Sequence, residues 1–150
     1  MFRLSKKTEY ALLALQNLAQ REGELVSVKE LAQKLDISFE FLSKTMQLLM
    51  KKGLVQSYQG IRGGYVLSKP AIEIKLMEVV NALKESINIV DCLPNTKQKT
   101  DECTRGSHCS IKNHLYLIQK KIDDIFINTS IYDIATIDSE SKLSENHSKQ

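Results

Sequence analysis

Apolar residues are so dense in one early stretch of the chain that they surround a helix instead of lining one face. Between Thr8 and Gln20 the apolar positions are Tyr10, Ala11, Leu12, Leu13, Ala14, Leu15, Leu18 and Ala19. This pattern predicts a helix that other elements largely enclose. Glu9 is the one acidic residue of the stretch and therefore stands out.

Two shorter helical patterns with recognisable N-terminal caps follow. The first begins at Ser27, whose hydroxyl is expected to cap backbone N–H groups while Glu30 reaches back. It ends near Leu35, and its 3-4 spaced stripe is Val28, Leu31, Ala32 and Leu35. After a short link, Ser38 caps the second helix, whose expected inward face is Phe41, Leu42, Thr45, Met46 and Leu49. The second helix should stop at Gly53, and together the pair predicts a helix-turn-helix.

The outward positions of the second helix indicate what such a motif does. They include Phe39, Glu40, Ser43, Lys44 and Gln47. Polar side chains on the first turns of a recognition helix meet base edges in the major groove of DNA. An ordinary helical hairpin with a solvated face remains the alternative.

A glycine-rich hairpin is expected next. Residues Leu54–Tyr58 and Tyr65–Leu67 are β-prone, and the link between them is Gln59-Gly60-Ile61-Arg62-Gly63-Gly64. This arrangement predicts a wing whose Gln59 and Arg62 contact a DNA groove or phosphates. The alternative is a solvated arginine in a flexible turn.

The second half of the chain has three parts. A helical pattern from Ile74 to Lys84 follows the boundary at Pro70, and residues 86–109 lose all periodicity. A heptad seam then recurs at Ile111, Leu115, Ile118, Ile122 and Ile125, with Gln119, Lys120, Lys121, Asp123 and Asp124 elsewhere on the helix. Such a seam predicts a homodimer, although docking on its own domain is the alternative.

Composition narrows this interpretation without changing it. The chain has 150 residues, of which 42% are hydrophobic, and can bury one modest core. Residues 1–70 carry 11 Lys/Arg against 6 Asp/Glu, whereas residues 71–150 carry 10 against 12. Only the first half therefore suits a polyanion. No apolar run approaches a membrane span and no signal segment opens the chain, so we expect a cytoplasmic protein, with a disordered tail at 138–150.

The candidate chemistry lies in the irregular segment. Cys92, Cys103 and Cys109 are the three cysteines of the chain, and all fall within 18 residues. Zinc sites usually contain paired Cys-x2-4-Cys knuckles, which are absent here. Wider spacing in a loop suits an iron–sulfur cluster. A free-thiol redox switch, a zinc site and inert cysteines stay open as alternatives.

The order of these features resembles the Rrf2 family of bacterial regulators, of the IscR and NsrR type. The resemblance covers about residues 1–135 and rests on Leu4-Ser5, Glu9-Tyr10-Ala11-Leu12, Ile37-Ser38, Phe41-Leu42, Lys52-Gly53-Leu54-Val55, the segment Gly60-Ile61-Arg62-Gly63-Gly64-Tyr65-Val66-Leu67 and the three cysteines. It implies a mostly α, winged-helix homodimer that binds promoter DNA and carries a 2Fe-2S or 4Fe-4S cluster. We expect a DNA-binding domain at 1–85, a cluster loop at 86–109, a dimerisation helix and return segment at 110–137, and the tail.

The fourth cluster ligand is where this chain departs from its family. IscR-like members have a histidine three residues after the last cysteine, where this chain has Lys112. His114 is poorly aimed, because it lies about 140° round a helix from Cys109. His108 is a weaker candidate than Glu9, which aligns with an acidic position that NsrR-like members use to ligate a cluster from the partner subunit. A carboxylate is a harder and weaker iron ligand than a thiolate.

The expected function is therefore a repressor whose promoter affinity follows an iron–sulfur cluster that senses cluster status, nitric oxide or redox stress. Base reading is assigned to Ser38, Glu40, Ser43, Lys44 and Gln47, and wing contact to Gln59 and Arg62. The alternative is a DNA-binding regulator without a cluster, controlled by cysteine oxidation or a partner protein. An enzyme is not expected, because no Ser/His/Asp or Cys/His constellation is present.

Overall fold

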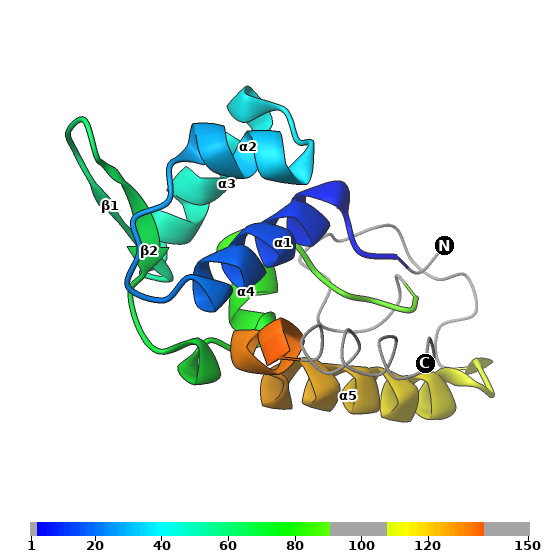
Figure 1. Cartoon of the computed structure of the whole chain (residues 1–150). Coiled ribbons are helices and arrows are strands. Elements are labelled where there is room, and N and C mark those ends of the chain that lie inside the picture. The colour runs from blue at the N-terminus through cyan, green and yellow to red at the C-terminus, as the bar shows by residue number, and fades with distance from the viewer. Residues whose placement is uncertain (1–2, 91–107, 137–150) are drawn as a thin grey trace, which may run out of the picture.

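The chain folds into a helical body with a projecting hairpin and one protruding helix (Figure 1). The structure is a computed structural model that describes residues 3–90 and 108–136. In chain order the elements are α1 Lys6–Gln20, α2 Val28–Leu35, α3 Phe39–Lys51, β1 Val55–Tyr58, β2 Gly64–Leu67, the 3-10 turn η1 Ala71–Glu73, α4 Leu76–Ala82 and α5 Lys112–Asn128. A helical stretch also occupies residues 131–136. The predicted fold class, mostly α with a small β-hairpin, is confirmed.

Helix α1 forms the centre of the core, as its apolar composition predicts. Ala11, Ala14 and Leu15 have no exposed surface, and α1 packs against α2, α3, α4 and β2. The helix begins two residues before the predicted Thr8, because the Ser5 hydroxyl accepts a hydrogen bond from the Thr8 backbone N–H at 3.1 Å.

Helices α2 and α3 form the predicted helix-turn-helix. The Ser27 hydroxyl accepts from the Glu30 N–H at 3.1 Å, and Asp36 takes a left-handed conformation, φ 54°, that ends α2 and turns the chain. The Glu30 carboxylate pairs with the Arg21 guanidinium, so the second half of the predicted capping box is not formed.

The inward face of α3 differs from its prediction at one position. Leu42, Thr45, Met46 and Leu49 are buried as expected, whereas Phe41 is 39% exposed. The Phe41 ring lies edge-on to the Tyr10 ring, with centroids 5.5 Å apart. Phe41 therefore covers the rim of the core and is not part of its interior.

The hairpin has the predicted strands in antiparallel register, with Val55 opposite Leu67 and Tyr58 opposite Gly64. A single bridge joins Tyr65 to Val26, in which the Tyr65 N–H donates to the Val26 carbonyl at 2.8 Å. This bridge sets the hairpin against the entrance to α2. A Cβ added to Gly64 would lie 2.6 Å from the Val26 carbonyl carbon, so only glycine allows this approach.

Helix α4 and the residues after α5 close the core from the other side. The predicted helix at 74–84 is shorter than expected, because η1 and an extended Ile74 precede α4. The Leu76 N–H donates to the Thr129 carbonyl at 2.9 Å, and the Ile131 N–H donates to the Ile74 carbonyl at 2.8 Å. Ile131 is fully buried in the same core as Leu15 and Leu31. The core therefore includes a residue from beyond the first 85.

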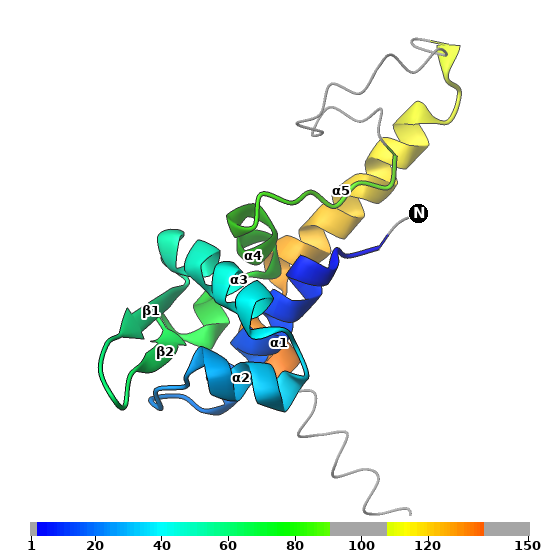
Figure 2. The same ribbon diagram turned by 90° about the horizontal axis from the view of Figure 1, so that it is seen from above.

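Helix α5 is held at one end and projects at the other (Figure 2). Its C-terminal end packs beside α4, while its N-terminal end extends away from the body. Its exposed apolar residues are Ile111, Tyr116, Leu117, Ile118, Ile125 and Ile127. No helix of the described residues combines the length and apolar character needed to cross a bilayer.

Candidate functional site

Helix α3 presents its predicted polar positions on the surface. Glu40, Lys44 and Gln47 are exposed, and Ser43 is half-buried. The Ser38 hydroxyl accepts from the Phe41 N–H at 3.5 Å and so caps α3, as predicted. The base-reading role predicted for the same residue stays a prediction. Phe39 is 55% exposed at the same end of α3. These residues bring polar and aromatic groups to the N-terminal turns of a helix, where the major groove is read.

A groove of about 490 Å³ separates α3 from the hairpin. Its lining includes the predicted Gln47 and Gln59, and also Lys29 from the first turn of α2 and Lys51 from the last turn of α3. Sequence reasoning missed both lysines. Lys51 lies four residues after Gln47 on the same face of α3, a signal that was available. Lys29 had no comparable signal, because only the fold brings the start of α2 beside the hairpin.

The cationic side chains around this groove have no acidic partner in the described part of the chain. Within residues 3–90 and 108–136, no ion pair involves Lys29, Lys44, Lys51 or Arg62. By contrast, Arg21 is held by Glu24 in the link before α2 and by Glu30 in the first turn of α2. Unpaired cations along a groove attract polyanions, and their charge contributes little to the stability of the folded chain.

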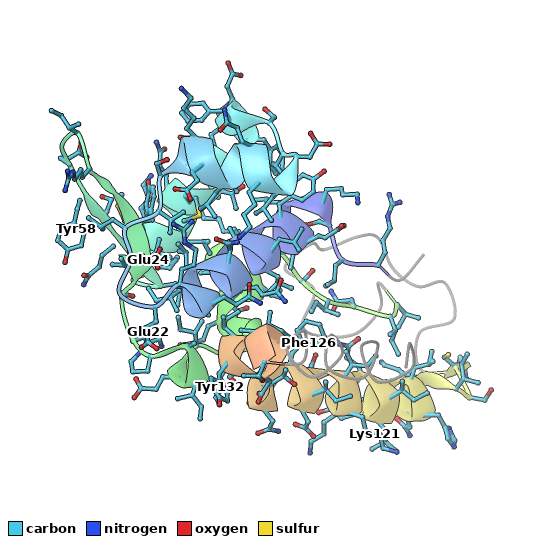
Figure 3. The ribbon with its side chains drawn as sticks, viewed as in Figure 1. Glu22, Glu24, Tyr58, Lys121, Phe126 and Tyr132 are labelled. Carbon is cyan, nitrogen blue, oxygen red and sulfur yellow. The ribbon has the colours of Figure 1, made fainter. Side chains whose placement is uncertain are left out.

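The wing tip stands clear of the body. The hairpin projects from the helices in Figure 3, with the labelled Tyr58 pointing outward. Arg62 is exposed next to a completely exposed Ile61, and Gly60 turns the chain at φ 120°. A protruding tip with one arginine has the shape and charge to enter a groove of a duplex.

The predicted cysteine site is described only in part. Cys92 and Cys103 lie outside the described residues. Cys109 is half-buried three residues before α5, and His108 is exposed. Among the described residues, no three His, Cys, Asp or Glu side chains lie together as a metal site. His114 is exposed on the first turn of α5.

Glu9 lies on the first turn of α1 with a side chain that is 46% exposed, and its carboxylate pairs with the Lys6 ammonium at 2.8 Å. The hydrogen bond to Glu9 and the attraction of its charge raise the pKa of Lys6. The pairing with Lys6 is the alternative that competes with a ligand role for Glu9. An exposed pair three residues apart contributes little, so another cation can displace the lysine.

A cleft of about 840 Å³ adjoins Glu9. Residues from the two ends of the DNA-binding half line it, among them Ser5, Lys6 and Glu9 from around the start of α1 and Glu85, Ser86 and Ile87 from beyond α4. The Lys7 ammonium donates to the Leu83 carbonyl at 2.8 Å and fixes these two segments beside each other. Glu9 therefore borders the segment that continues toward Cys92. An accessible carboxylate beside a cysteine-bearing segment is a donor set compatible with iron.

Comparisons with known proteins match the chain to transcriptional regulators. The family model described as "Rrf2: Iron-dependent Transcriptional regulator" matches residues 4–137. The chain is 40% identical over 89 residues to the HTH-type transcriptional regulator IscR of Cereibacter sphaeroides, across 57% of this chain and 57% of that protein. It thus spans little more than half the length of that relative.

Two further likenesses cover more of the chain. Over 114 residues it is 33% identical to the HTH-type transcriptional regulator NsrR of Shouchella clausii, across 75% of this chain and 74% of that protein. The structure of CymR, described as the global cysteine regulator of B. subtilis, superimposes with a TM-score of 0.73 and 25% identity, covering 91% of this chain and 98% of CymR.

Proposed function

The chain belongs to the Rrf2 family of transcriptional regulators, and on that premise we propose that it is a cytoplasmic, homodimeric repressor whose promoter affinity is controlled by an iron–sulfur cluster. Its family and relatives are DNA-binding transcriptional regulators and not enzymes. The observation that carries the proposal is the groove between α3 and the hairpin, where Lys29 and Lys51 form no ion pair with any described residue.

In this proposal α3 enters the major groove, and the wing contacts the adjacent backbone. Glu40, Ser43, Lys44 and Gln47 read base edges, with Ser38 at the start of the helix. Lys29, Lys51, Gln59 and Arg62 contact phosphates or the minor groove. Cationic contacts of this kind release counterions from the duplex, so binding falls steeply as salt rises.

The DNA-binding half is tested by reversing the charge of the groove. Lys29→Glu combined with Lys51→Glu should weaken binding to a duplex selected from a random-sequence pool by more than about tenfold at near-physiological salt. The control is Lys121→Glu, because Lys121 points away from the body of the protein in Figure 3. If the double variant bound the duplex as tightly as the unmodified protein, the groove would not face DNA.

The cluster is held, in this proposal, by the thiolates of Cys92, Cys103 and Cys109 and by the Glu9 carboxylate of the partner subunit. His108 is the less favoured fourth ligand, and Lys112 is unsuitable while protonated. A 2Fe-2S or 4Fe-4S cluster supplies a centre that exchanges electrons and reacts with oxidants or nitric oxide. The exposed carboxylate of Glu9 supports the assignment, because it is accessible to a second subunit.

A ligand that crosses the dimer also explains how the cluster would control DNA affinity. Glu9 lies on α1, which packs against the recognition helix α3. Binding Glu9 to a cluster held by the other subunit would fix the relative position of two recognition helices. Loss of the cluster would release that constraint and change the spacing at which the dimer meets two half-sites.

The cluster assignment is tested by anaerobic purification from iron-replete cells, with visible absorption, iron and acid-labile sulfide measured per protomer. We expect cluster stoichiometry in the unmodified protein and its loss or spectral alteration in Glu9→Ala. His108→Ala and Glu22→Ala should leave the spectrum unchanged, the latter because Glu22 is an exposed acid outside the site. Iron and sulfide retained unchanged in Glu9→Ala would remove Glu9 from the ligand set.

A second candidate function is a family member without a cluster, controlled by cysteine oxidation or a partner protein. Lys112 at the usual histidine position and the likeness to CymR favour it. Colourless protein without sulfide, even after reconstitution, would support this alternative. Intact mass under mild oxidant would then separate its two forms, because a disulfide removes two hydrogen atoms and partner control leaves the mass unchanged.

A further inference from the structure

One polar side chain of α5 is buried, although apolar side chains close to it are exposed. Gln119 is 3% exposed and is the buried residue of that helix, whereas the two preceding residues, Leu117 and Ile118, are 57% and 48% exposed. Burying a carboxamide is unfavourable unless its polar atoms are hydrogen-bonded. Its position therefore requires partners.

Gln119 has three hydrogen-bond partners. Its Oε1 accepts from the Ile89 backbone N–H at 2.9 Å, and its Nε2 donates to the Ile87 carbonyl at 2.6 Å and to the Asp123 carboxylate at 2.8 Å. The carboxylate can only accept, so Asp123 turns the amide nitrogen toward itself and leaves Oε1 for Ile89. The orientation of the carboxamide is thus determined by α5 itself.

The two hydrogen bonds to the backbone hold residues 87–89 in the way that a neighbouring strand would. The Ile87 carbonyl and the Ile89 N–H flank Asn88 and face the same way, and a carboxamide presents its acceptor and donor side by side. Two bonds from one planar group fix direction as well as distance. In Figures 1 and 2 this stretch follows α5 after leaving α4.

Other attachments of this stretch are few. In the described part of the chain, residues 86–90 form no hydrogen bond with another helix or strand apart from the two with Gln119. The Asn88 amide bonds only to the nearby Ser86 hydroxyl, at 3.1 Å. Cys92 follows Ile89 by three residues in the sequence. Gln119 therefore links α5 to the entrance of the cysteine segment.

We propose that Gln119 is a positioning residue that holds the entrance of the cysteine segment on α5, so that a change in the ligand state of Cys92 is transmitted to that helix. The transmission step rests on the proposed regulatory function. The contact between Gln119 and residues 87–89 does not depend on that function. A ligand change that pulls on residues 87–89 would either carry Gln119 and α5 with it or break two hydrogen bonds. Without the clamp, the cysteine segment and α5 would respond independently.

The test uses the full chain and removes the clamp from each side. Gln119→Leu keeps the volume and deletes the polar atoms. Ile89→Pro deletes the N–H donor and leaves the sequence of α5 unchanged. It therefore replaces Gln119→Leu in the test if that variant fails to fold. Lys121→Leu is the control, because it adds the same side chain at an exposed position two residues along α5.

Amide hydrogen exchange over residues 84–90 tests the positioning role whether or not a cluster is bound. Gln119→Leu should accelerate exchange of the Ile89 amide by about tenfold or more, while Lys121→Leu should not. Unchanged protection of Ile89 in Gln119→Leu would overturn the proposal.

The ratio of operator affinities between cluster-loaded and cluster-free protein tests transmission. Gln119→Leu and Ile89→Pro should each move this ratio toward one by roughly threefold or more, and the double variant should match the single ones. A ratio unchanged in both variants would overturn transmission through Gln119. A ratio of one in the unmodified protein would instead contradict the proposed function, and the exchange result would still decide whether Gln119 positions the segment.

Discussion

Arg62 is a single exposed charge that we propose to bind an external partner. It lies at the tip of the hairpin, exposed, and forms no ion pair within the described residues. Its removal should therefore cost the folded chain very little, since an unpaired surface charge contributes almost nothing to stability. Its effect should appear in DNA binding alone.

We expect Arg62→Ala to weaken binding to many duplex sequences about equally, by about fivefold, and to lower the slope of log affinity against log salt by about one. Titration of several duplexes at three salt concentrations measures both quantities. The thermal unfolding midpoint should not change. A loss confined to one base sequence would contradict a phosphate contact.

Lys44→Ala provides the contrast, because Lys44 is exposed on the face of α3 that we assign to the major groove. Its removal should change the preference at particular base pairs and leave binding to unrelated sequences nearly constant. Footprints in which Arg62→Ala altered base preference and Lys44→Ala did not would reverse the two roles.

Local rules predicted some residues well and others not at all. Ser27 and Ser38 were identifiable as caps, because a cap depends on three or four consecutive residues. Phe41 and Gln119 were misplaced, the first assigned inward and the second among the polar positions off the seam. The position of Phe41 depends on Tyr10, and the burial of Gln119 depends on Ile87 and Ile89, all of which are distant in sequence. Helical phase alone does not contain that information.

At the scale of elements, the hairpin depends on its contact with the start of α2. Gly64 is in the strand and not at a positive φ, so its requirement for glycine comes from crowding by the Val26 backbone and not from its own backbone conformation. This contact sets the angle of the wing relative to α3, and with it the width of the groove between them.

Gly64→Ala should destabilise the fold by about 1–3 kcal/mol, because the new Cβ must displace backbone atoms. Chemical denaturation measures the loss. Gln56→Ala is the matched control, since Gln56 is exposed on the facing strand. DNA affinity should fall in Gly64→Ala even under conditions in which the protein is fully folded. If Gly64→Ala and Gln56→Ala had equal unfolding free energies, the hairpin would not be held against Val26.

The turn after α5 contains a carboxylate that stabilises the next helical stretch. Asp133 accepts from the Ser130 backbone N–H at 2.7 Å and from the Ser130 hydroxyl at 2.9 Å, while the Asp133 N–H donates to that hydroxyl at 3.2 Å. The hydrogen bonds from the Ser130 backbone and hydroxyl lower the pKa of Asp133 below its ordinary 3.8. The ionised carboxylate is therefore the form that caps residues 131–136.

This cap should make part of the stability depend on pH in the acid range. A carboxyl whose folded pKa is lowered stabilises the protein above its unfolded value and loses that contribution as pH falls through the folded value. The difference in unfolding free energy between the unmodified protein and Asp133→Ala should thus be constant near neutrality and shrink below about pH 4. Denaturation curves of both proteins between pH 2 and 7 test this, and a difference that grew on acidification would refute it.

The order and type of the elements were predictable because each has a local signal: caps for α2 and α3, glycines for the hairpin, and a heptad for α5. Their ends were less predictable. The helix expected at 74–84 is shortened because Ile74 is extended and pairs with Ile131, more than fifty positions away. The groove lysine Lys29 was missed for the same reason, since its neighbours come from another element.

At the scale of the whole molecule, α5 has more apolar surface than the described part of its own chain covers. Ile118 is 48% and Ile125 is 61% exposed, and both belong to the predicted seam. Scattered exposed leucines and isoleucines are ordinary, but a stripe along a projecting helix is typical of an interface. This surface supports the proposed homodimer.

Ile118→Glu combined with Ile125→Glu should give a folded monomer, because the side chains are exposed in the single chain and their burial is required only between chains. Sedimentation velocity measures the mass, and circular dichroism verifies the fold. Affinity for a two-half-site duplex should fall by on the order of 100-fold, since one bound half would no longer assist the other. Lys121→Glu should remain a dimer, and a dimeric double variant would place the interface elsewhere.

The burial of Ile131 in the core has a consequence for the synthesis of the protein. Helices α2 and α3 are translated first, yet the core that they share with Ile131 cannot be completed until residue 131 has left the ribosome. Domains usually begin to fold while translation continues. Here the final packing must wait until residue 131 has been synthesised and has left the ribosome, so a shorter, ribosome-bound chain should present an unfinished core and be a substrate for chaperones.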